Sequence, residues 1–319
     1  MRKSLSVSAI PLVAALLFSG SAASQLASFR IIVPYPPASG PDILSRLMAD
    51  QIGRGPQGPT VVVENRPGGG TTIGTEAAAR SPADGSTVLL VANSFVVNPA
   101  LKKTGYDVSG SFEPVCYLAA TPIVLVVAGS SPYRSLEDLL AAARSKPGEI
   151  TVAGAPASSL QIAYEVLKRS AQVNMTYVPF PGSAPAVNAL LGGHVSAVSA
   201  DYPTVVPHLK SGTLRALVTG GKTRVDALPD VPTFAETGLG NYQDEIFYGM
   251  VAPAKTPAPV LAQLSAAFST ALKAPETRPK LSQQGLFPVD LCGTAFGDYL
   301  REKVEQYGRI VAEANIKAE

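Results

Sequence analysis

The sequence predicts an α/β fold with two doubly wound domains and a ligand cleft between them. Short apolar runs alternate with amphipathic segments, a pattern typical of parallel strands joined by helices. The 319 residues are enough for two domains of ordinary size. At least four of the apolar runs end in loops of small residues that lead into a predicted helix. Because ligands of open α/β sheets bind beyond the carboxyl ends of strands, we expect these loops to line one shared cleft.

The first predicted strand and helix lie within residues 31–52. The apolar run 31–33 stops at Pro34, and from Asp42 onward apolar residues recur with a helical period. Asp42 stands where an N-cap belongs, so its carboxylate is expected to accept a backbone N–H of the first turn. The loop and helix N-terminus favour a small anion, because unpaired N–H groups and the helix dipole converge there. The same pattern also fits an ordinary turn without a ligand.

The elements that follow repeat this alternation. The further predicted strands are residues 60–63, 87–92, 123–128, 151–153, 175–178, 195–200 and 214–219. The further predicted helices are residues 72–79, 136–145, 160–170, 186–191, 258–271 and 296–314. Each of the last two helices is amphipathic, and we expect both to pack back on the first domain.

The N-terminus has the pattern of a secretory signal peptide, which we assign to residues 1–24. Arg2 and Lys3 precede an apolar run over residues 10–18, and small residues follow at 20–24. The apolar run is about half the roughly 20 residues that a membrane-spanning helix needs. The sequence therefore predicts a soluble protein exported to the periplasm.

Composition and motifs argue against nucleic-acid binding and against an enzyme. The chain has 26 basic against 24 acidic residues, and only 16% of its residues are charged, so no basic footprint for nucleic acid exists. The only histidines are His194 and His208, the mature chain has no G-x-S-x-G elbow, and no zinc-ligand spacing occurs. We expect no cofactor and no metal. A secreted α/β enzyme acting on a small organic acid remains the alternative.

The two cysteines are far apart in the sequence. Cys116 and Cys292 are expected in a compartment that permits disulfides. A bridge between them and two separate buried thiols are both compatible with the sequence.

Asp201 is the candidate for a charged group that faces the ligand. It follows the predicted strand 195–200 and precedes Tyr202 and Pro203. A carboxylate there would accept a hydrogen bond from a hydroxyl or ammonium group, or repel a second carboxylate. As an alternative, Asp201 is the N-cap of the following helix.

Several segments together resemble one known family over nearly the whole mature chain. They are IIVPYPPASGPDILSRLMADQI at 31–52, VVVENRPGGG at 61–70, PADGSTVLL at 82–90, VPFPGSAPAVNALLGGHV at 178–195, LPDVPTFAETGL at 228–239 and YGMVAPAKTP at 248–257. The chain resembles the periplasmic substrate-binding receptors of tripartite tricarboxylate transporters, the Bug-type family.

The resemblance implies a fold like that of type II periplasmic binding proteins. Domain 1 would comprise residues 25–115 and 248–319, and domain 2 residues 116–247, with hinges near 113–118 and 247–251. It also implies an extracytoplasmic receptor, expected to be monomeric, that binds a small organic carboxylate for uptake through membrane permease subunits. A ligand-sensing partner of a signalling protein would use the same cleft.

The resemblance implies a site built from the loops 35–42 and 180–185, completed by loops at 94, 155–159 and 201. The expected ligand-binding residues are Tyr35, Ala38, Ser39, Asp42, Ser94, Ala155, Ala157, Ser158, Phe180, Gly182, Ser183, Ala184, Asp201 and Phe247. Two departures alter the expected pocket. Ala38 and Ser39 stand where relatives usually have two glycines, and Phe247 and Tyr248 stand where relatives commonly have a tryptophan.

Overall fold

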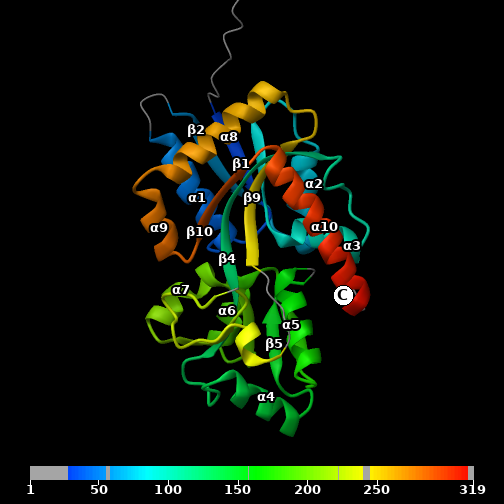
Figure 1. The fold of residues 1–319 in the computed structure, drawn as a ribbon, viewed down its shortest axis with the longest axis vertical. Coiled ribbons are helices and arrows are strands. Elements are labelled where there is room, and N and C mark those ends of the chain that lie inside the picture. The colour runs from blue at the N-terminus through cyan, green and yellow to red at the C-terminus, as the bar shows by residue number, and fades with distance from the viewer. Residues whose placement is uncertain (1–27, 55–57, 157, 222, 240–244, 315–319) are drawn as a thin grey trace, which may run out of the picture.

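A computed structural model describes residues 28–54, 58–156, 158–221, 223–239 and 245–314, and Figure 1 shows its fold. The predicted signal peptide lies outside the described residues. Within the described part of the chain, none of the helices combines the length and hydropathy that crossing a bilayer requires.

The first half of the molecule contains both ends of the described chain. Its N-terminal elements are β1 (Ser28–Val33), α1 (Gly40–Gly53), β2 (Thr60–Asn65), the short 3-10 helix η1 (Gly69–Thr71), α2 (Thr72–Ala79), β3 (Thr87–Val91) and α3 (Asn93–Leu101). Its C-terminal elements are β9 (Glu245–Pro253), α8 (Ala258–Lys273), α9 (Thr277–Gln283), β10 (Phe287–Cys292) and α10 (Thr294–Ala314). The strands pair in the order β2-β1-β3-β9-β4, so the C-terminal segment returns to the first half as predicted.

The second half is a smaller α/β unit. It consists of α4 (Leu136–Ser145), β5 (Thr151–Gly154), α5 (Ser159–Ser170), β6 (Thr176–Pro179), α6 (Ser183–Leu191), β7 (Ala197–Asp201), α7 (Tyr202–Lys210), β8 (Leu214–Thr219) and the 3-10 helix η2 (Ala235–Thr237). The parallel pairs β5–β6 and β5–β7 are joined to the rest of the sheet through β7 and β8, which run antiparallel to β4.

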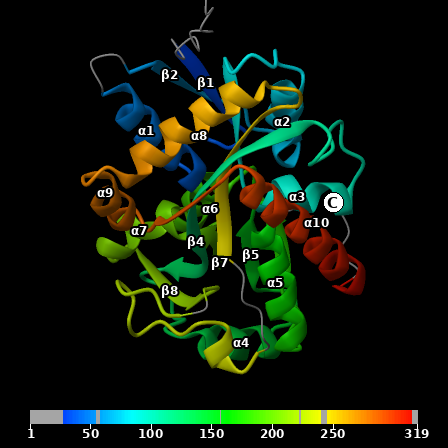
Figure 2. The same ribbon diagram turned by 45° about the horizontal axis from the view of Figure 1, so that its top comes forward.

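Strand β4 (Phe112–Ala128) belongs to both halves. Residues 112–122 pair with β9, whereas residues 123–128 pair with β7 and β8. Figure 2 shows the strand running between the halves. The prediction gave only its last six residues as a strand, since Pro114 and Pro122 interrupt the apolar run. The domain division after residue 115 and before residue 248 stays a prediction.

Helices cover both faces of each part of the sheet. In the first half, α1 and α8 pack on one face through residues such as Met48 and Phe268, and α2, α3 and α10 pack on the other through residues such as Phe95 and Tyr307. In the second half, α4 and α5 cover one face, while α6 and α7 cover the other. This layering is the doubly wound arrangement that the sequence predicts.

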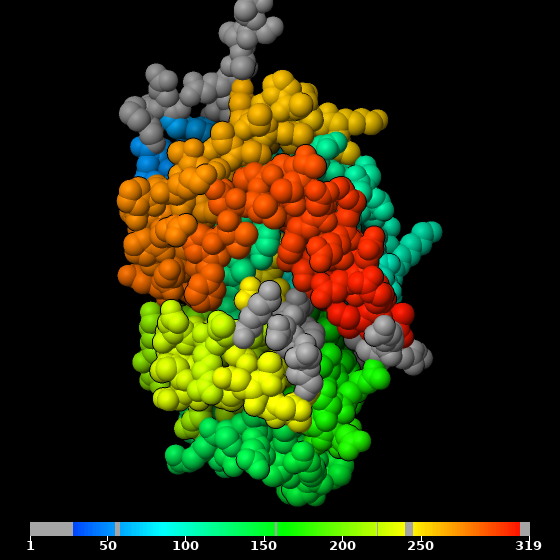
Figure 3. All heavy atoms as spheres, viewed as in Figure 1, coloured from blue at the N-terminus to red at the C-terminus, as the bar shows by residue number. Residues whose placement is uncertain are grey.

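The two halves of the molecule are in contact with each other. Figure 3 shows the orange and red segments of the first half lying against the green and yellow segments of the second. Helix α5 contributes to this contact, because Leu160 and Ile162 pack into the two cores of the first half. The boundary therefore contains buried apolar side chains from both halves.

The two cysteines form a disulfide in the structure. Cys116 on β4 is joined to Cys292 at the end of β10, across 176 positions of sequence. The two residues face each other in the antiparallel pairing of these strands. Of the two alternatives that the sequence leaves open, the structure therefore contains the bridge.

Candidate functional site

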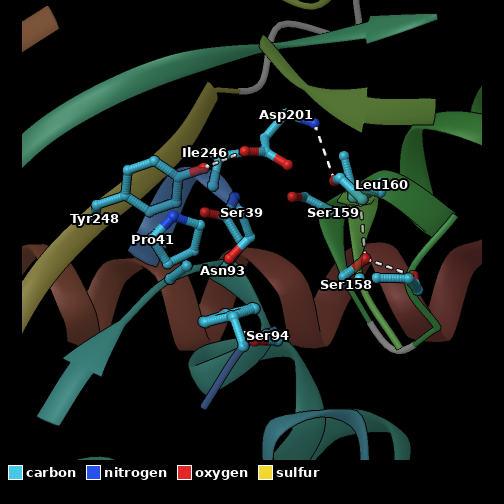
Figure 4. Close-up of a pocket in the computed structure, with 15 residues that line it drawn as sticks. Ser39, Pro41, Asn93, Ser94, Ser158, Ser159, Leu160, Asp201, Ile246 and Tyr248 are labelled. Carbon is cyan, nitrogen blue, oxygen red and sulfur yellow. Dashed lines mark hydrogen bonds between the residues drawn. The ribbon is translucent and has the colours of Figure 1, made fainter. Parts of the chain in front are cut away.

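A pocket lies at the boundary between the halves, as Figure 4 shows. Its cavity volume is about 40 Å³, and it is partly open to solvent. The residues that line it are Tyr35, Ser39, Pro41, Ala92, Asn93, Ser94, Ala155, Ser158, Ser159, Leu160, Gly182, Ser183, Asp201, Ile246 and Tyr248. They come from both halves and include no Lys, Arg or His, so Asp201 is the charged group among the described lining residues.

Most of the lining residues belong to the beginnings of helices. The N-cap residues Ser39, Ala92, Ser158, Gly182 and Asp201 of α1, α3, α5, α6 and α7 all line the pocket. First-turn N–H groups have no partner within their helix, and the helix dipole places partial positive charge there. The pocket is therefore suited to an anion, although it has no cationic side chain.

The first helix begins two residues earlier than predicted. Its first residue is Gly40, and Ser39, not Asp42, occupies the N-cap position. The Ser39 hydroxyl donates to the carbonyl of Pro36 at 2.7 Å, so it closes the loop. Sequence periodicity missed this start because Gly40 and Pro41 are not apolar markers of a helix, although Pro is favoured in the first turn.

Asp42 binds its own loop and does not line the pocket. Its carboxylate accepts hydrogen bonds from the Ala38 backbone N–H at 2.9 Å, from Asn65 at 2.9 Å and from Arg46 at 3.0 Å. Burial alone would raise the pKa of Asp42, but these donors together lower it below its ordinary value. Asp42 therefore holds the loop and α1 against β2, which corrects the prediction that it is the N-cap of the helix.

Asp201 connects the halves at the pocket. It is buried at the end of β7, and its Oδ2 accepts the backbone N–H of Gly40 at 2.8 Å. The Thr204 hydroxyl lies 3.0 Å from Oδ1 and 2.9 Å from Oδ2, and the Tyr248 hydroxyl lies 3.3 Å from Oδ2. Asp201 has the N-cap position of α7, but its carboxylate bonds no backbone N–H of that helix. It reaches α1 instead.

Two tyrosines, the buried Tyr248 and the half-buried Tyr35, supply neutral donors beside Asp201. Burial raises the pKa of Tyr248 well above its ordinary value, and the nearby Asp201 carboxylate raises it further. Burial also raises the pKa of Tyr35, partly offset by its 2.6 Å hydrogen bond with the Ser94 hydroxyl. Both phenols therefore keep their protons at neutral pH.

The structure brings together most of the predicted site residues, but not all. Tyr35, Ser39, Ser94, Ala155, Ser158, Gly182, Ser183 and Asp201 line the pocket. Ala38, Asp42, Phe180, Ala184 and Phe247 do not line it, and Ala157 lies outside the described residues. A role in ligand binding stays a prediction for the residues that line it.

Phe247 is the clearest departure from the predicted site. Its ring is buried in the first half against the rings of Tyr117 and Tyr299. Because side chains alternate across a strand, its neighbours Ile246 and Tyr248 face the pocket instead. The alternation of side chains along a strand puts residues 246 and 248 on the same face of β9. The sequence does not determine whether that face is turned to the pocket or to the core.

Asn93 is a lining residue that the sequence analysis missed. Its side-chain oxygen accepts the backbone N–H of Phe247 at 2.9 Å, and its side-chain nitrogen donates to the carbonyl of Glu245 at 3.1 Å. It thereby ties the start of α3 to β9. Lining residues Pro41, Ala92, Ser159 and Leu160 were also not singled out. Helix α3 was not predicted, since residues 93–101 lack a helical apolar period.

The described residues contain no group of three or more His, Cys, Asp or Glu side chains that could hold a metal ion. The polar groups of the described pocket lining are hydroxyls, backbone amides, the Asn93 side-chain amide and one carboxylate. This set suits binding of a small polar anion through hydrogen bonds.

Comparisons with known proteins agree with this geometry. Residues 44–316 match the model of the tripartite tricarboxylate transporter family receptor. The chain is 32% identical over 295 residues to Protein BugT of Bordetella pertussis, covering 90% of this chain and 89% of BugT. The structure of the periplasmic binding protein BugD is similar with a TM-score of 0.87 and 29% identity, covering 92% of this chain and 99% of BugD.

A second solved structure contains a carboxylate. MatC from Rhodopseudomonas palustris with bound malate is similar with a TM-score of 0.83 and 28% identity, covering 89% of this chain and 98% of MatC. Family model, relatives and fold all agree. The chain belongs to the family of tripartite tricarboxylate transporter receptors, which includes the Bug proteins, and it is a solute receptor with the two-domain fold of periplasmic binding proteins.

Proposed function

We propose that this chain works in the periplasm as a monomeric receptor that delivers a small organic carboxylate to the permease subunits of its transporter. One observation carries the proposal. The first turns of helices from both halves converge on a pocket whose described lining has no cationic side chain. Backbone donors of this kind hold a carboxylate firmly enough for capture, while a movable boundary allows release.

Malate bound to MatC supports a carboxylate ligand for this chain too. A receptor also fits the chemistry of the lining better than an enzyme does. The pocket has no histidine or cysteine among its described lining residues, and the Ser158 hydroxyl is engaged with the Ala155 carbonyl at 2.6 Å.

The proposal is tested by calorimetry with purified protein and a panel of short carboxylates, each compared with its amide. We expect at least one carboxylate to bind and its amide to bind at least tenfold more weakly, because the amide lacks the charge that the helix N-termini favour. Ser39→Phe should weaken carboxylate binding at least tenfold, about 1.4 kcal/mol.

Ser145→Phe is the matched control, because Ser145 is exposed at the end of α4, away from the pocket lining. Chromatography of the same mixtures measures turnover. Conversion of a bound carboxylate into a product would identify a secreted enzyme instead of a receptor. Equal affinity for acids and amides would contradict the anion site.

A further inference from the structure

Asp201 places a negative charge inside a pocket that otherwise suits an anion. We infer that Asp201 selects the ligand: the receptor prefers a molecule with one carboxylate and, at its other end, a hydroxyl or ammonium donor, and it rejects a second carboxylate there. The inference rests on the proposed function, because it assigns the ends of a carboxylate ligand within that same pocket.

The first step is the division of the pocket's anion-binding groups. Oδ2 of Asp201 already accepts the Gly40 N–H at the start of α1, at 2.8 Å. A carboxylate of the protein thus occupies the terminus that the sequence assigns to the ligand. The starts of α3 and α6, at Asn93 and Ser183, also line the pocket and can hold the carboxylate of a ligand.

The second step concerns how closely Asp201 fits its place. A Cβ atom at position 40 would lie 2.2 Å from Oδ2 of Asp201 and 2.6 Å from the Tyr248 hydroxyl. Only glycine at this position allows the carboxylate to reach the helix backbone. Asp201 is itself 4% exposed, so it is a fixed part of the pocket wall.

The third step is the remaining capacity of the carboxylate. A carboxylate accepts about four hydrogen bonds, and Gly40, Thr204 and Tyr248 supply three donors at most. Figure 4 shows one oxygen of Asp201 directed at Tyr248 and the other at the space in front of Ser159. Asp201 and Ser159 both line the pocket, so a donor group of a ligand in the pocket would lie close to this oxygen.

The fourth step is the penalty for the wrong ligand. A second ligand carboxylate at this end would meet Asp201 in a buried setting, where solvent screens like charges poorly. The described lining has no cation to separate them. A methyl end group would avoid repulsion but would leave the free acceptor of Asp201 without a partner.

The test uses four probes that share a four-carbon chain and differ in the group at its far end: 4-hydroxybutyrate, 4-aminobutyrate, butyrate and succinate. Calorimetry of the native protein should give tighter binding of at least one of the two donor probes than of butyrate, and at least tenfold tighter binding than of succinate. The hydroxyl and ammonium arms show which donor the site prefers. The four end groups are also tested on chains of three, five and six carbons, so that the result does not depend on one choice of ligand length.

Asp201→Asn should shrink the preference over succinate at least tenfold, because the repulsive charge is gone. Thr204→Val keeps the charge and should keep the native order. Asp138→Asn removes a carboxylate that accepts backbone N–H groups at the start of α4, far from the pocket lining, and should lower stability without reordering the probes.

The outcomes separate the two proposals. If carboxylates bind but succinate ranks with or above the donor probes in the native protein, the selection is wrong while the receptor function stands. If Asp201→Asn binds the probes in the same order of affinity as the native protein, the selection by Asp201 is likewise wrong while the receptor function stands. If that variant does not fold, the native order alone decides. If no carboxylate of any length binds, the proposed function fails, and the selection fails with it.

Discussion

Ala38 adopts a left-handed backbone conformation in the first loop of the pocket, with φ of 61°. This conformation is unfavourable for a residue with a Cβ atom, by about 1–2 kcal/mol. The loop keeps Ala38 there because its N–H donates to the Asp42 carboxylate at 2.9 Å, which also binds Arg46 and Asn65. Ala38 is therefore a strained residue in this loop.

We predict that Ala38→Gly stabilises the protein. The substitution removes the free-energy cost of the left-handed backbone, which is larger than the stability lost because glycine raises the entropy of the unfolded chain. The free energy of unfolding is therefore expected to increase by about 0.5–1 kcal/mol. Urea unfolding measures it. The control is Ala141→Gly on the exposed face of α4, where glycine should cost about 1 kcal/mol. Lower stability of Ala38→Gly would mean that the loop does not strain Ala38.

At the scale of elements, β10 depends on more than strand pairing for its attachment. It pairs with β4 through two short stretches that are separated by a register shift between Pro288 and Leu291. Asp290, within this shift, has a left-handed backbone with φ of 60°. The disulfide between Cys116 and Cys292 fixes the end of this irregular strand to β4.

We predict that breaking this disulfide destabilises the protein by about 2–5 kcal/mol, since the bridge closes a loop of 176 positions and restricts the unfolded chain. Urea unfolding with and without a thiol reductant should show a lower midpoint in reductant. The double variant Cys116→Ser, Cys292→Ser should unfold at that lower midpoint and should not respond to reductant. A native protein that is insensitive to full reduction, verified by thiol titration, would contradict the prediction.

At the scale of the whole molecule, the described structure has the two halves in contact over the pocket. The Asp201–Gly40 hydrogen bond spans 161 positions of sequence and joins the halves. Pro36 of the first loop lies against Gly182 of the second half, where an added Cβ would be 3.0 Å from its Cδ. The described arrangement is thus a closed form, in which the starts of helices from both halves face one pocket.

We predict that a ligand shifts the protein toward this closed form. A ligand that touches both halves binds the closed form better, and only such a difference in affinity moves the equilibrium. X-ray scattering should give a smaller radius of gyration with a carboxylate that calorimetry shows to be saturating. Gly182→Leu should bind more weakly and compact less, because its side chain meets Pro36.

Gly308→Ala is the control for this variant, since a methyl group there meets nothing within 4 Å. Its scattering curves should match those of the native protein in both states. Identical curves for the native protein with and without saturating ligand would show that the cleft does not close.

The sequence by itself determined those elements whose signals are local. Helices α2 and α4 and strand β8 have the predicted bounds. For these elements, the spacing of apolar residues and the residues that mark the ends are contained in the segment itself. For α4, the capping box of Ser135 and Asp138 marks the start in the sequence. The resemblance to the receptor family, and no local signal, is what placed Ser94, Ser158 and Ser183 near a common site with Asp201.

Only the tertiary structure decided the features that join distant segments. The face of β9 that turns Tyr248 to the pocket and Phe247 to the core depends on which helices cover the sheet, not on the period of the strand. The extension of β4 through Pro114 and Pro122 depends on its partners β9 and β10. Asp201 reaches Gly40 because packing of the halves brings the ends of β7 and the start of α1 together, and no local pattern contains that distance.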